Sequence, residues 1–406
     1  MTGLSSDLRP PFANLDGRKP EELFGNVPTP AYVIDEGALR KNGEILKKLA
    51  ERTGCRILLA QKAFSNYDFY PLLAPFLAGT EASGLYEARL GKERMPEGET
   101  HVFSAAYREE EFQELLKYAD HIVFNSVSQL GRFGKRAKEA GKEIGLRLNP
   151  ECSTQEGHAV YDPCAPGSRL GVTRSAWERE MTPALASLLD GFHFHTLCEQ
   201  DSDALETTLS AVEERFDDLL PKVKWLNMGG GHHITKPGYG LERLERLILD
   251  AKRKWDAEVY LEPGEAVALN AGYFLTRVLD VVENNGVKTA ILDGSAACHM
   301  PDVIEMPYLP PLYGADPEEK KGEVYRLAGP TCLAGDVIGD YAFRTPLCEG
   351  DLLAFGDMAI YTTCKNNTFN GMPLPDIWRL REDRTLRKLT DFGYEEFVRR
   401  LGSREG

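Results

Sequence analysis

The sequence lacks the marks of disulfide-stabilised and membrane-spanning proteins. Its 8 cysteines are spread over 406 residues and include no C-x-x-C pair, which is typical of reduced thiols and predicts neither a disulfide framework nor a zinc ribbon. No segment approaches the ~20 apolar residues that a membrane span needs. The first residues also lack a basic segment followed by an apolar run. We therefore expect a cytoplasmic protein.

Basic residues are scarce relative to acidic ones, because 48 Lys and Arg against 63 Asp and Glu give a net charge of −15. This balance argues against binding to nucleic acid or to an anionic membrane, since both need clustered basic side chains. It is compatible with a small cationic ligand. With 42% hydrophobic and 27% charged residues, the chain has the composition of an ordinary folded protein, and its length suffices for an enzyme of about two or three domains.

A regular alternation of strand-like and helix-like segments occupies residues 37–270. Eight short β-like runs lie at residues 56–62, 80–83, 101–105, 121–125, 144–148, 191–196, 224–228 and 258–262. Helical periodicity separates them, most clearly at residues 86–94, 109–118, 127–140, 203–219 and 241–254. Eight such alternations predict a TIM-like parallel (β/α)₈ barrel of the α/β class.

Beyond residue 270 the sequence pattern changes from alternating strands and helices to β-like runs that are separated by Gly, Pro and Asp, without intervening helices. The runs lie at residues 273–282, 288–293, 324–328, 351–355 and 359–363. They predict an all-β domain over residues 271–406. The strand-like run at residues 29–34 has no place among eight barrel strands, so we expect residues 1–36 to join the C-terminal sheet. Asp35 can cap a helix that begins near Gly37.

Several polar residues fall where the predicted barrel strands end, which is the end that carries the active site in such barrels. They are Lys62, Arg147, His195, the glycines Gly229, Gly230 and Gly231, and Glu262. Lys62 follows an apolar run, and burial there is expected to lower its pKa and to favour a nucleophilic amine that forms a Schiff base. Taken alone, a lysine at a strand end more often reaches water or pairs with a carboxylate.

The three glycines at residues 229–231 predict a phosphate site. Barrels often bind phosphate in the loops after strands seven and eight, and glycine lets backbone N–H groups approach an anion. The alternative is a flexible turn. The place of the glycines after the seventh run favours phosphate.

Histidines at two spacings raise the question of a metal site. His193 and His195 lie two apart on one strand, and His232 and His233 are adjacent. No acidic or cysteine ligand completes a plausible coordination sphere for either pair, so we predict no metal and expect hydrogen-bonded histidines.

Two further residues have both an ordinary and a chemical interpretation. Glu262 opens the sequence E-P-G-E, where a strand-end carboxylate either caps the loop or holds a proton on a heteroaromatic nitrogen. Cys332, in G-P-T-C, is either a small buried side chain or a reactive thiol.

Together these motifs resemble the fold-type III pyridoxal-phosphate decarboxylases, the family that contains ornithine, diaminopimelate and carboxynorspermidine decarboxylases. The resemblance covers nearly the whole chain. Its markers are A-x-K at 60–62, F-H at 194–195, G-G-G at 229–231, E-P-G at 262–264, G-P-T-C at 329–332, Y-T at 361–362 and T-F-N-G at 368–371. Within the family, HFHTLCEQ, HMPDVIEMPY and FNGMPLPDIW are most similar to the carboxynorspermidine (carboxyspermidine) branch.

The resemblance implies an alanine-racemase-like barrel and a role for each strand-end residue. Lys62 would bind the aldehyde of pyridoxal 5'-phosphate and His195 would stack on its ring. The three glycines would hold its phosphate, with Arg147 beside the cofactor, and Glu262 would pair with the ring nitrogen. Tyr361 would reach the phosphate from the β domain.

The resemblance also implies a homodimer with shared active sites and a cationic, carboxylated polyamine as substrate. Cys332, supplied by the partner subunit, would return a proton to the substrate carbon, a task suited to a thiol with a pKa about 1–2 units above neutrality. The expected reaction is decarboxylation of carboxynorspermidine or carboxyspermidine in polyamine biosynthesis. The candidate carboxylates for the ammonium groups are Glu265, Asp302, Glu305 and Asp336.

Two departures from the family pattern concern the phosphate. This chain has Leu197, Cys198 and Glu199 where relatives have a serine after the stacking histidine, and it has Glu265 where they have an arginine after E-P-G. A cationic phosphate contact is therefore missing, and backbone donors are expected to carry more of the binding. The negative charge of Glu265 fits a polyamine substrate.

Two other functions stay open at this point. The first is decarboxylation of meso-diaminopimelate or another basic amino acid on the same fold, although the distal carboxylate of diaminopimelate needs cationic partners. The second is a non-catalytic pyridoxal-phosphate carrier, for which the extra β domain and Cys332 would be superfluous. The sequence does not show whether carboxynorspermidine or carboxyspermidine is the preferred substrate, because one methylene changes the binding free energy by only about 1–3 kcal/mol.

Overall fold

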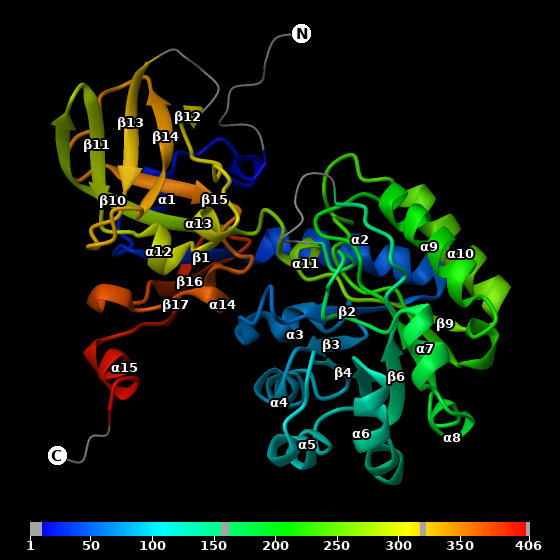
Figure 1. Cartoon of the computed structure of the whole chain (residues 1–406). Helices are drawn as coiled ribbons and strands as arrows, with labels where there is room; N and C mark the ends of the chain where they lie inside the picture. The colour runs from blue at the N-terminus through cyan, green and yellow to red at the C-terminus, as the bar shows by residue number, and fades with distance from the viewer. Residues whose placement is uncertain (1–9, 156–161, 317–321, 403–406) are drawn as a thin grey trace. The chain divides into compact units, whose positions relative to one another are not determined.

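The computed structural model describes residues 10–155, 162–316 and 322–402 (Figure 1). The chain forms two compact units, one of Met1–Leu39 with Ala268–Gly406 and the other of Arg40–Val267.

The unit of residues 40–267 is a closed barrel of eight parallel strands, as predicted. Its strands, in the order in which they pair, are β2 (Arg56–Ala60), β3 (Gly79–Ala82), β4 (Glu99–Phe103), β5 (His121–Phe124), β6 (Glu143–Arg147), β7 (Gly191–His193), β8 (Trp225–Asn227) and β9 (Glu258–Leu261). β9 pairs with β2 and closes the ring. Each of the eight strands overlaps the run that the sequence predicts for it, so the barrel prediction is confirmed.

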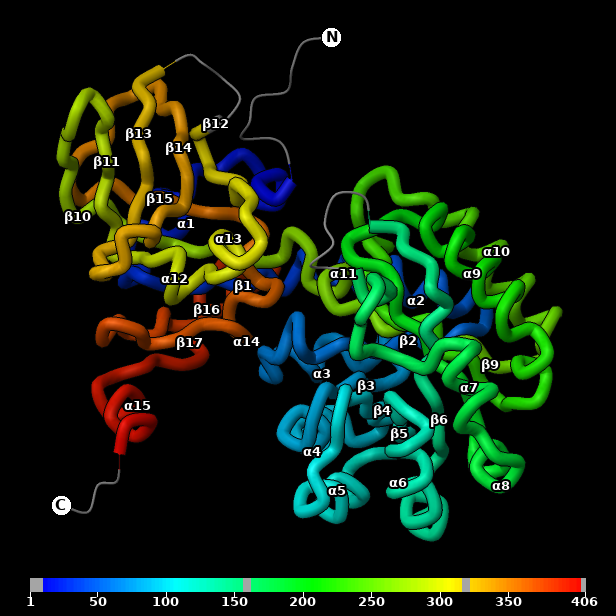
Figure 2. The backbone as a smooth tube through the Cα atoms, in the orientation of Figure 1, coloured from blue at the N-terminus to red at the C-terminus, as the bar shows by residue number. Residues whose placement is uncertain are grey.

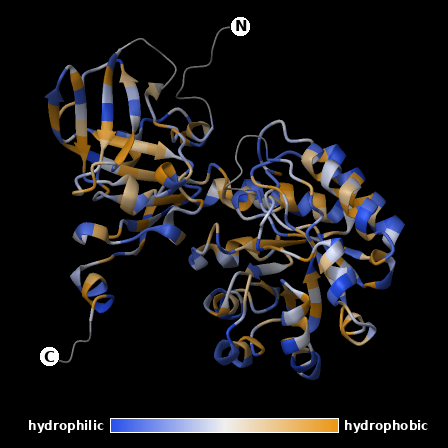
Figure 3. Ribbon diagram, in the orientation of Figure 1, coloured by the Kyte–Doolittle hydropathy of each residue, from blue (hydrophilic) through white to orange (hydrophobic). Residues whose placement is uncertain are grey.

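Helices and short turns precede, connect and follow these strands, and several of the helices are amphipathic. They are α2 (Glu36–Thr53), α3 (Tyr70–Leu73), α4 (Leu85–Arg94), α5 (Glu109–Leu115), α6 (Val127–Glu139), α7 (Arg174–Glu180), α8 (Pro183–Ala186), α9 (Ser202–Phe216), α10 (Leu241–Trp255), α11 (Glu265–Ala268) and the 3-10 turns Tyr67–Phe69 and Leu220–Lys222. Helix α10 buries Leu244, Leu247, Ile248 and Ala251, the spacing of one helical face. Figure 3 shows the resulting mixture of blue and orange residues along α9 and α10. No helix in the described ranges combines the length and apolar character of a membrane span.

The second unit is built on a nine-stranded mixed sheet with the order β12-β14-β13-β11-β10-β1-β16-β17 and with β15 also paired to β10. The strands are β1 (Ala31–Asp35), β10 (Gly272–Asn284), β11 (Val287–Leu292), β12 (Ala315–Asp316), β13 (Glu323–Ala328), β14 (Val337–Phe343), β15 (Leu352–Gly356), β16 (Asp376–Leu380) and β17 (Leu386–Thr390). The N-terminal strand β1 lies between β10 and β16, which confirms the prediction that it joins the C-terminal sheet (Figure 2).

The central strands of this sheet are buried on both faces. Alternate residues of β1 enter different apolar clusters, since Ala31 and Val33 pack on one face and Tyr32 on the other. β10 repeats the pattern, with Tyr273 and Phe274 on opposite faces. This is the two-residue period of a strand, and it explains why the run at residues 29–34 is apolar throughout. At the end of β1, the Asp35 carboxylate accepts the Ala38 N–H at 3.1 Å and caps α2, as expected.

The prediction of a strand at residues 359–363 is wrong. Tyr361 has a left-handed φ of 57°, and the backbone N–H of Lys365 then bonds to its carbonyl at 2.9 Å, which closes the helical turn α14 (Thr362–Lys365). Strands β12, β14, β16 and β17 lie outside the predicted runs. The unit also contains the short helices α1 (Pro20–Phe24), α12 (Ala296–His299), α13 (Asp302–Glu305) and α15 (Tyr394–Arg399), with 3-10 turns at Phe12–Leu15 and Phe369–Gly371.

Candidate active site

The carboxyl end of the barrel gathers the strand-end residues that the sequence singles out. Lys62 follows β2, Arg147 ends β6, His195 follows β7, and Glu262 follows β9. The Arg147 guanidinium donates to the His195 carbonyl at 2.9 Å. This hydrogen bond holds the loop after β7 in place. Arg147 is itself fixed, because it is buried and its guanidinium lies 4.6 Å from the centre of the Phe103 ring.

Lys62 lies beside a buried carboxylate that the sequence analysis did not include. Its Nζ is 3.6 Å from Oε2 of Glu81, a residue of β3 that is only 2% exposed. Burial alone would lower the pKa of Lys62. The carboxylates of Glu81 and Glu262 raise the pKa by more than burial lowers it, so the pKa lies above its ordinary value. The prediction of a lowered pKa is therefore wrong, because it counted burial without these two charges.

Glu81 is placed to exchange a proton with Lys62, although its charge favours the protonated amine. Burial raises the pKa of its carboxyl, although Lys62 opposes the shift. Glu81 was missed because β3 is short and its only visible signal is an acidic residue near the end of a strand. A lysine must lose its proton before it becomes a nucleophile, and a neighbouring carboxylate that accepts protons readily provides for that loss.

Glu262 is an ionised carboxylate held by two neighbouring strands. Its Oε2 lies 3.1 Å from the Nε2 of His193, and its Oε1 accepts from the Asn227 amide at 2.6 Å. Burial raises the pKa of Glu262, but the interaction with His193 and the positive charge of Lys62 outweigh burial, so the pKa falls below its ordinary value. Because a carboxylate only accepts, the Nε2 of His193 carries the proton. The H-x-H spacing of His193 raised only the question of a metal ligand, and nothing in the sequence indicated its role here or that of Asn227.

The glycine turn is required by the close packing of the loops around it. Gly229 and Gly231 have φ values of 69° and 82°, and a Cβ on Gly231 would lie 2.0 Å from the Leu197 carbonyl oxygen. The Gly229 N–H donates to Asn227 at 2.9 Å, and the Gly230 N–H donates to Nδ1 of His195 at 2.8 Å. Two of the three predicted phosphate donors are therefore engaged within the protein.

His195 is a neutral imidazole in a defined tautomer. Burial lowers its pKa well below the ordinary value, and the cations of Lys62 and Arg147 lower it further. Since Nδ1 accepts from Gly230, the proton lies on Nε2. A flat, neutral ring fixed at the barrel mouth is suited to stack on an aromatic ligand.

The expectation that no acidic residue accompanies the adjacent histidines is wrong for His233. Its Nε2 lies 2.8 Å from Oε2 of Glu265, and Glu199 joins the same cluster, with the three ligand atoms within 4.8 Å of one another. Backbone pairing of Gln200 with Gly231 and His233 ties the two loops together. His193, for its part, contacts Glu262 as described above. Sequence spacing alone did not reveal these contacts, because the residues come from three different loops.

Three of the four predicted anchors for the substrate tail lie in the sheet unit, and each of these three already has a partner there, whereas Glu265 lies in the barrel unit. The ammonium of Lys365 pairs with both Asp302 and Glu305. The Asp336 carboxylate accepts from the hydroxyl groups of Ser295 and Thr331, at 2.8 and 2.7 Å for one of its oxygens. These contacts favour structural roles for the three carboxylates over open ammonium sites.

Cys332 and Tyr361 are also in the sheet unit. Cys332 is exposed, and its backbone N–H donates to the Asn370 side chain at 2.9 Å, which links the G-P-T-C and T-F-N-G motifs. The left-handed backbone of Tyr361 is uncommon for a bulky residue and is often found at functional positions.

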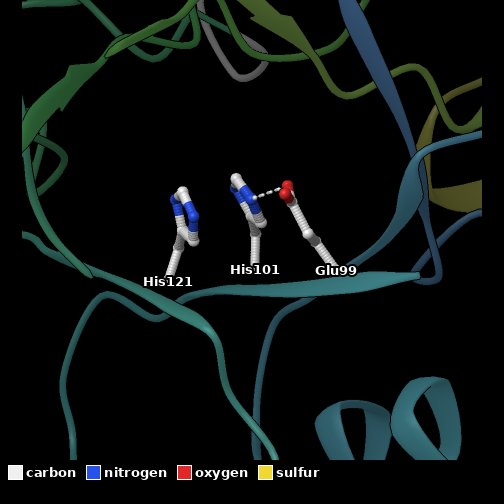
Figure 4. Close-up of side chains that lie close together, drawn as sticks. All are labelled: Glu99, His101 and His121. Carbon is white, nitrogen blue, oxygen red and sulfur yellow. Dashed lines mark hydrogen bonds and ion pairs between the residues drawn. The ribbon is translucent and has the colours of Figure 1, made fainter. Parts of the chain in front are cut away.

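A second cluster of titratable groups lies inside the barrel (Figure 4). It is near the start of β4 and β5, whereas Lys62 follows the end of β2. His101 of β4 and His121 of β5 are register partners, so their rings stack with centroids 3.9 Å apart and planes inclined by 16°. Glu99 lies two residues before His101 on the same face, and its Oε2 is 3.2 Å from the His101 Nε2.

This cluster is not arranged for a metal ion. A metal binds imidazole nitrogen in the plane of each ring, and two parallel rings cannot direct their lone pairs to one point. The Glu99 carboxylate also forms an ion pair with Arg56, and the Arg56 guanidinium lies 2.6 Å from Oε1 of Glu99. The amino end of a barrel usually contributes stability rather than chemistry.

The cluster predicts a loss of stability in mild acid. Burial and the neighbouring His101 lower the pKa of His121 to about 3, against 6.5 in an unfolded chain. The unfolded state therefore binds an extra proton below pH 6.5, and stability falls by about 1.4 kcal/mol per pH unit between pH 6.5 and 3. His121→Phe, which retains an aromatic ring, should reduce this slope in urea unfolding measured from pH 7.5 to 5.

That window isolates His121 from its carboxylate neighbour. Burial alone would raise the pKa of Glu99, but His101 and Arg56 outweigh burial and lower it to about 2, so its contribution is lost only below about pH 4.5. An identical slope in the wild type and in His121→Phe would contradict the assignment.

The comparison with known families decides what this barrel mouth is. The sequence matches the family described as "Pyridoxal-dependent decarboxylase, C-terminal sheet domain" over residues 31–359. The chain belongs to the pyridoxal-dependent decarboxylases. The protein is therefore a decarboxylase that uses pyridoxal phosphate.

Several relatives match the decarboxylase along nearly its full length. It is 40% identical to the carboxynorspermidine/carboxyspermidine decarboxylase of Campylobacter jejuni, over 92% of this chain and 99% of that protein. It is also 40% identical to the carboxyaminopropylagmatine decarboxylase of Synechocystis sp., over 93% of this chain and 97% of that protein. A crystal structure of carboxynorspermidine decarboxylase from Campylobacter jejuni with norspermidine has a TM-score of 0.84 and 39% identity, and the match covers 92% of this chain and 100% of that one.

The residues at the barrel mouth fit pyridoxal phosphate. Lys62 offers an amine beside a proton acceptor, Glu262 is a buried, ionised carboxylate, and His195 is a neutral flat ring. These are the groups that an aldehyde, a pyridine nitrogen and an aromatic face require. The phosphate has fewer free backbone donors than three glycines suggest.

Proposed function

We propose that this protein decarboxylates carboxynorspermidine or carboxyspermidine, yielding norspermidine or spermidine, and that it acts in the cytoplasm as a homodimer. The observation that carries the proposal is the 40% identity to the Campylobacter jejuni enzyme over almost the full length of both chains. A second carboxynorspermidine/carboxyspermidine decarboxylase, from Herminiimonas arsenicoxydans, is 35% identical over 92% of this chain. The net charge of −15 suits a cationic substrate.

Lys62 and Glu81 control the proton at the reacting amine. When bound, pyridoxal phosphate supplies an aldehyde and an electron-accepting ring that stabilises negative charge on the substrate carbon after CO₂ leaves. Glu81 accepts the proton that Lys62 must lose before its nitrogen becomes nucleophilic, and it can return the proton when the lysine is released.

Glu262 would hold the proton on the ring nitrogen of the bound cofactor, and two positioning residues hold Glu262. His193 and Asn227 each donate to one of its oxygens, so both carboxylate oxygens have a fixed direction and the charge is retained in a buried site. His195, in its neutral form, would stack on the cofactor ring. Arg147 fixes the loop of His195 through the backbone.

Cys332 and Tyr361 are proposed to complete the site, Cys332 from the partner subunit. All four candidate carboxylates for the ammonium groups of the substrate have partners within their own unit, including Glu265, which pairs with His233.

Cys332→Ala is expected to separate CO₂ release from correct protonation. The proposed thiol returns a proton to the substrate carbon, so its loss should leave CO₂ release measurable but reduce the yield of intact polyamine and increase oxidative side products. Quantifying CO₂ and polyamine in the same reaction tests this, with Cys348→Ala, another exposed cysteine of the same unit, as the control. Equal yields of the two products at the normal rate would exclude the role.

A second candidate substrate is carboxyaminopropylagmatine. The Synechocystis enzyme named for it is as similar to this chain as the Campylobacter jejuni enzyme, with 40% identity in both cases. The two substrate types differ at the far end, where agmatine carries a guanidinium and norspermidine an amine. Diaminopimelate decarboxylases are more distant, at 26% identity for the Vibrio cholerae enzyme.

A competition assay tests the proposal. Equal concentrations of carboxynorspermidine, carboxyspermidine, carboxyaminopropylagmatine and meso-diaminopimelate are incubated with the holoenzyme, and the amine products are quantified by mass spectrometry. We expect one of the first two to have the highest kcat/KM. A higher kcat/KM for carboxyaminopropylagmatine or diaminopimelate would overturn the proposal and assign that substrate instead.

A further inference from the structure

A histidine–glutamate pair lies in the loops after the seventh and eighth barrel strands, and the reaction steps above give the histidine no role. His233 is 7% exposed, and its Nε2 lies 2.8 Å from Oε2 of Glu265. Because the carboxylate can only accept, the Nε2 of His233 carries a proton.

The other ring nitrogen has no partner. The Nδ1 of His233 is buried and makes no hydrogen bond to any residue in the described part of the chain. A buried polar atom without a partner is costly, so such atoms often mark the place of a ligand. If the ring is neutral, this nitrogen needs a donor. If the ring is an imidazolium, it needs an anion.

The position of the pair indicates an anion. Phosphate binds in (β/α)₈ barrels in the loops after strands seven and eight, which here are β8 and β9. His233 is two residues beyond Gly231, and Glu265 directly follows Gly264. The turn has already committed the N–H groups of Gly229 and Gly230 to side chains, so a phosphate needs a donor from elsewhere.

Negative charge around the pair requires a cation there as well. Glu199 and Glu265 both lie within 4.8 Å of a His233 nitrogen, and two carboxylates beside a phosphate would repel it. An imidazolium between a carboxylate and a phosphate satisfies both ring nitrogens and both anions.

We propose that His233 is protonated in the holoenzyme and bridges Glu265 and the phosphate of pyridoxal phosphate. It would supply the cationic contact that an arginine supplies where one follows E-P-G. The proposal rests on the family's cofactor and not on the identity of the polyamine substrate.

The neighbouring histidine provides a matched contrast. His232 is also buried with an unpartnered Nδ1 in the described chain, but its Nε2 contacts the Met228 carbonyl at 3.3 Å and no carboxylate. Burial lowers its pKa to about 4, so it is neutral. The carboxylate partner is what distinguishes His233.

The first test compares two ligands that differ only in the phosphate. Dissociation constants of pyridoxal phosphate and of pyridoxal are measured for the apoenzyme by absorbance, in the wild type, His233→Gln and His232→Gln. We expect His233→Gln to weaken pyridoxal phosphate by about 10- to 100-fold and to leave pyridoxal unchanged. His232→Gln should not discriminate between the ligands. Equal weakening of both ligands by His233→Gln, or none, would overturn the proposal.

The second test uses the sign of a charge effect. If His233 is neutral, Glu265→Gln removes a negative charge near the phosphate and should tighten pyridoxal phosphate binding. If His233 is an imidazolium sustained by Glu265, the same change removes the cation and should weaken binding several-fold. Tighter or unchanged binding of Glu265→Gln overturns the proposal. Neither assay uses the substrate, so the outcome is independent of the proposed decarboxylation.

Discussion

Lys62→Ala is expected to abolish the visible absorbance of the bound cofactor and to lower kcat on the order of 10³-fold or more. Lys62 is the amine beside the proton-accepting Glu81 at the carboxyl end of the barrel. Lys62 is also the one lysine among the barrel-mouth residues described above. A residue that forms the covalent link to a cofactor acts with the rest of the site as a unit, which makes its loss far larger than that of one contact.

The measurement is borohydride reduction of the holoenzyme followed by peptide mass analysis. The cofactor mass should appear on the peptide that contains Lys62 and should be absent in Lys62→Ala. Lys92→Ala is the matched control, because Lys92 is also in the barrel unit, is similarly exposed and pairs with Asp120 at 3.2 Å. Finding the adduct on another lysine, or an active Lys62→Ala enzyme, would remove the basis of the proposed site.

Glu262→Gln should lower kcat by about 10²- to 10³-fold while the cofactor remains bound. The glutamine side chain has nearly the same shape and can still accept from Asn227, but it carries no charge to hold the proton on the ring nitrogen. A preorganised charge in a buried site contributes about 3–4 kcal/mol to a transition state, which corresponds to this loss. The expected effect is therefore on the rate and not on cofactor affinity.

A control for Glu262→Gln lies on the same strand. Glu258 begins β9 at its exposed end, away from the active site, and Glu258→Gln should retain normal kcat. The test compares kcat with the amount of cofactor trapped by borohydride for each variant. Normal kcat in a fully loaded Glu262→Gln enzyme would rule out the proposed charge, and a loss of bound cofactor would show a binding role instead.

Much of the barrel and its candidate site could be predicted from residue order. Parallel strands buried on both faces read as short apolar runs, and a barrel collects their ends on one side, so Lys62, Arg147, His195 and Glu262 could be grouped without coordinates. The placement of β1 in the C-terminal sheet followed from counting, because a ninth strand has no room in an eight-stranded ring.

The predictions that were wrong concerned features that depend on contacts between distant segments or on backbone strain. The run at residues 359–363 has strand-forming residues, but the left-handed backbone of Tyr361 turns it into helix α14. The pKa of Lys62 has the opposite direction from the prediction because Glu81 arrives from another strand.

The sequence by itself determined the architecture, the family and the residues expected to touch the cofactor, since each depends on local pattern and on strand ends. Only the tertiary structure decided which groups share a charge or a hydrogen bond: Glu81 with Lys62, His193 with Glu262, and His233 with Glu265. Each of these pairs joins residues 19 or more positions apart on different strands or loops. Electrostatic interactions depend on distances of a few ångströms, and the order of residues along the chain does not specify such distances.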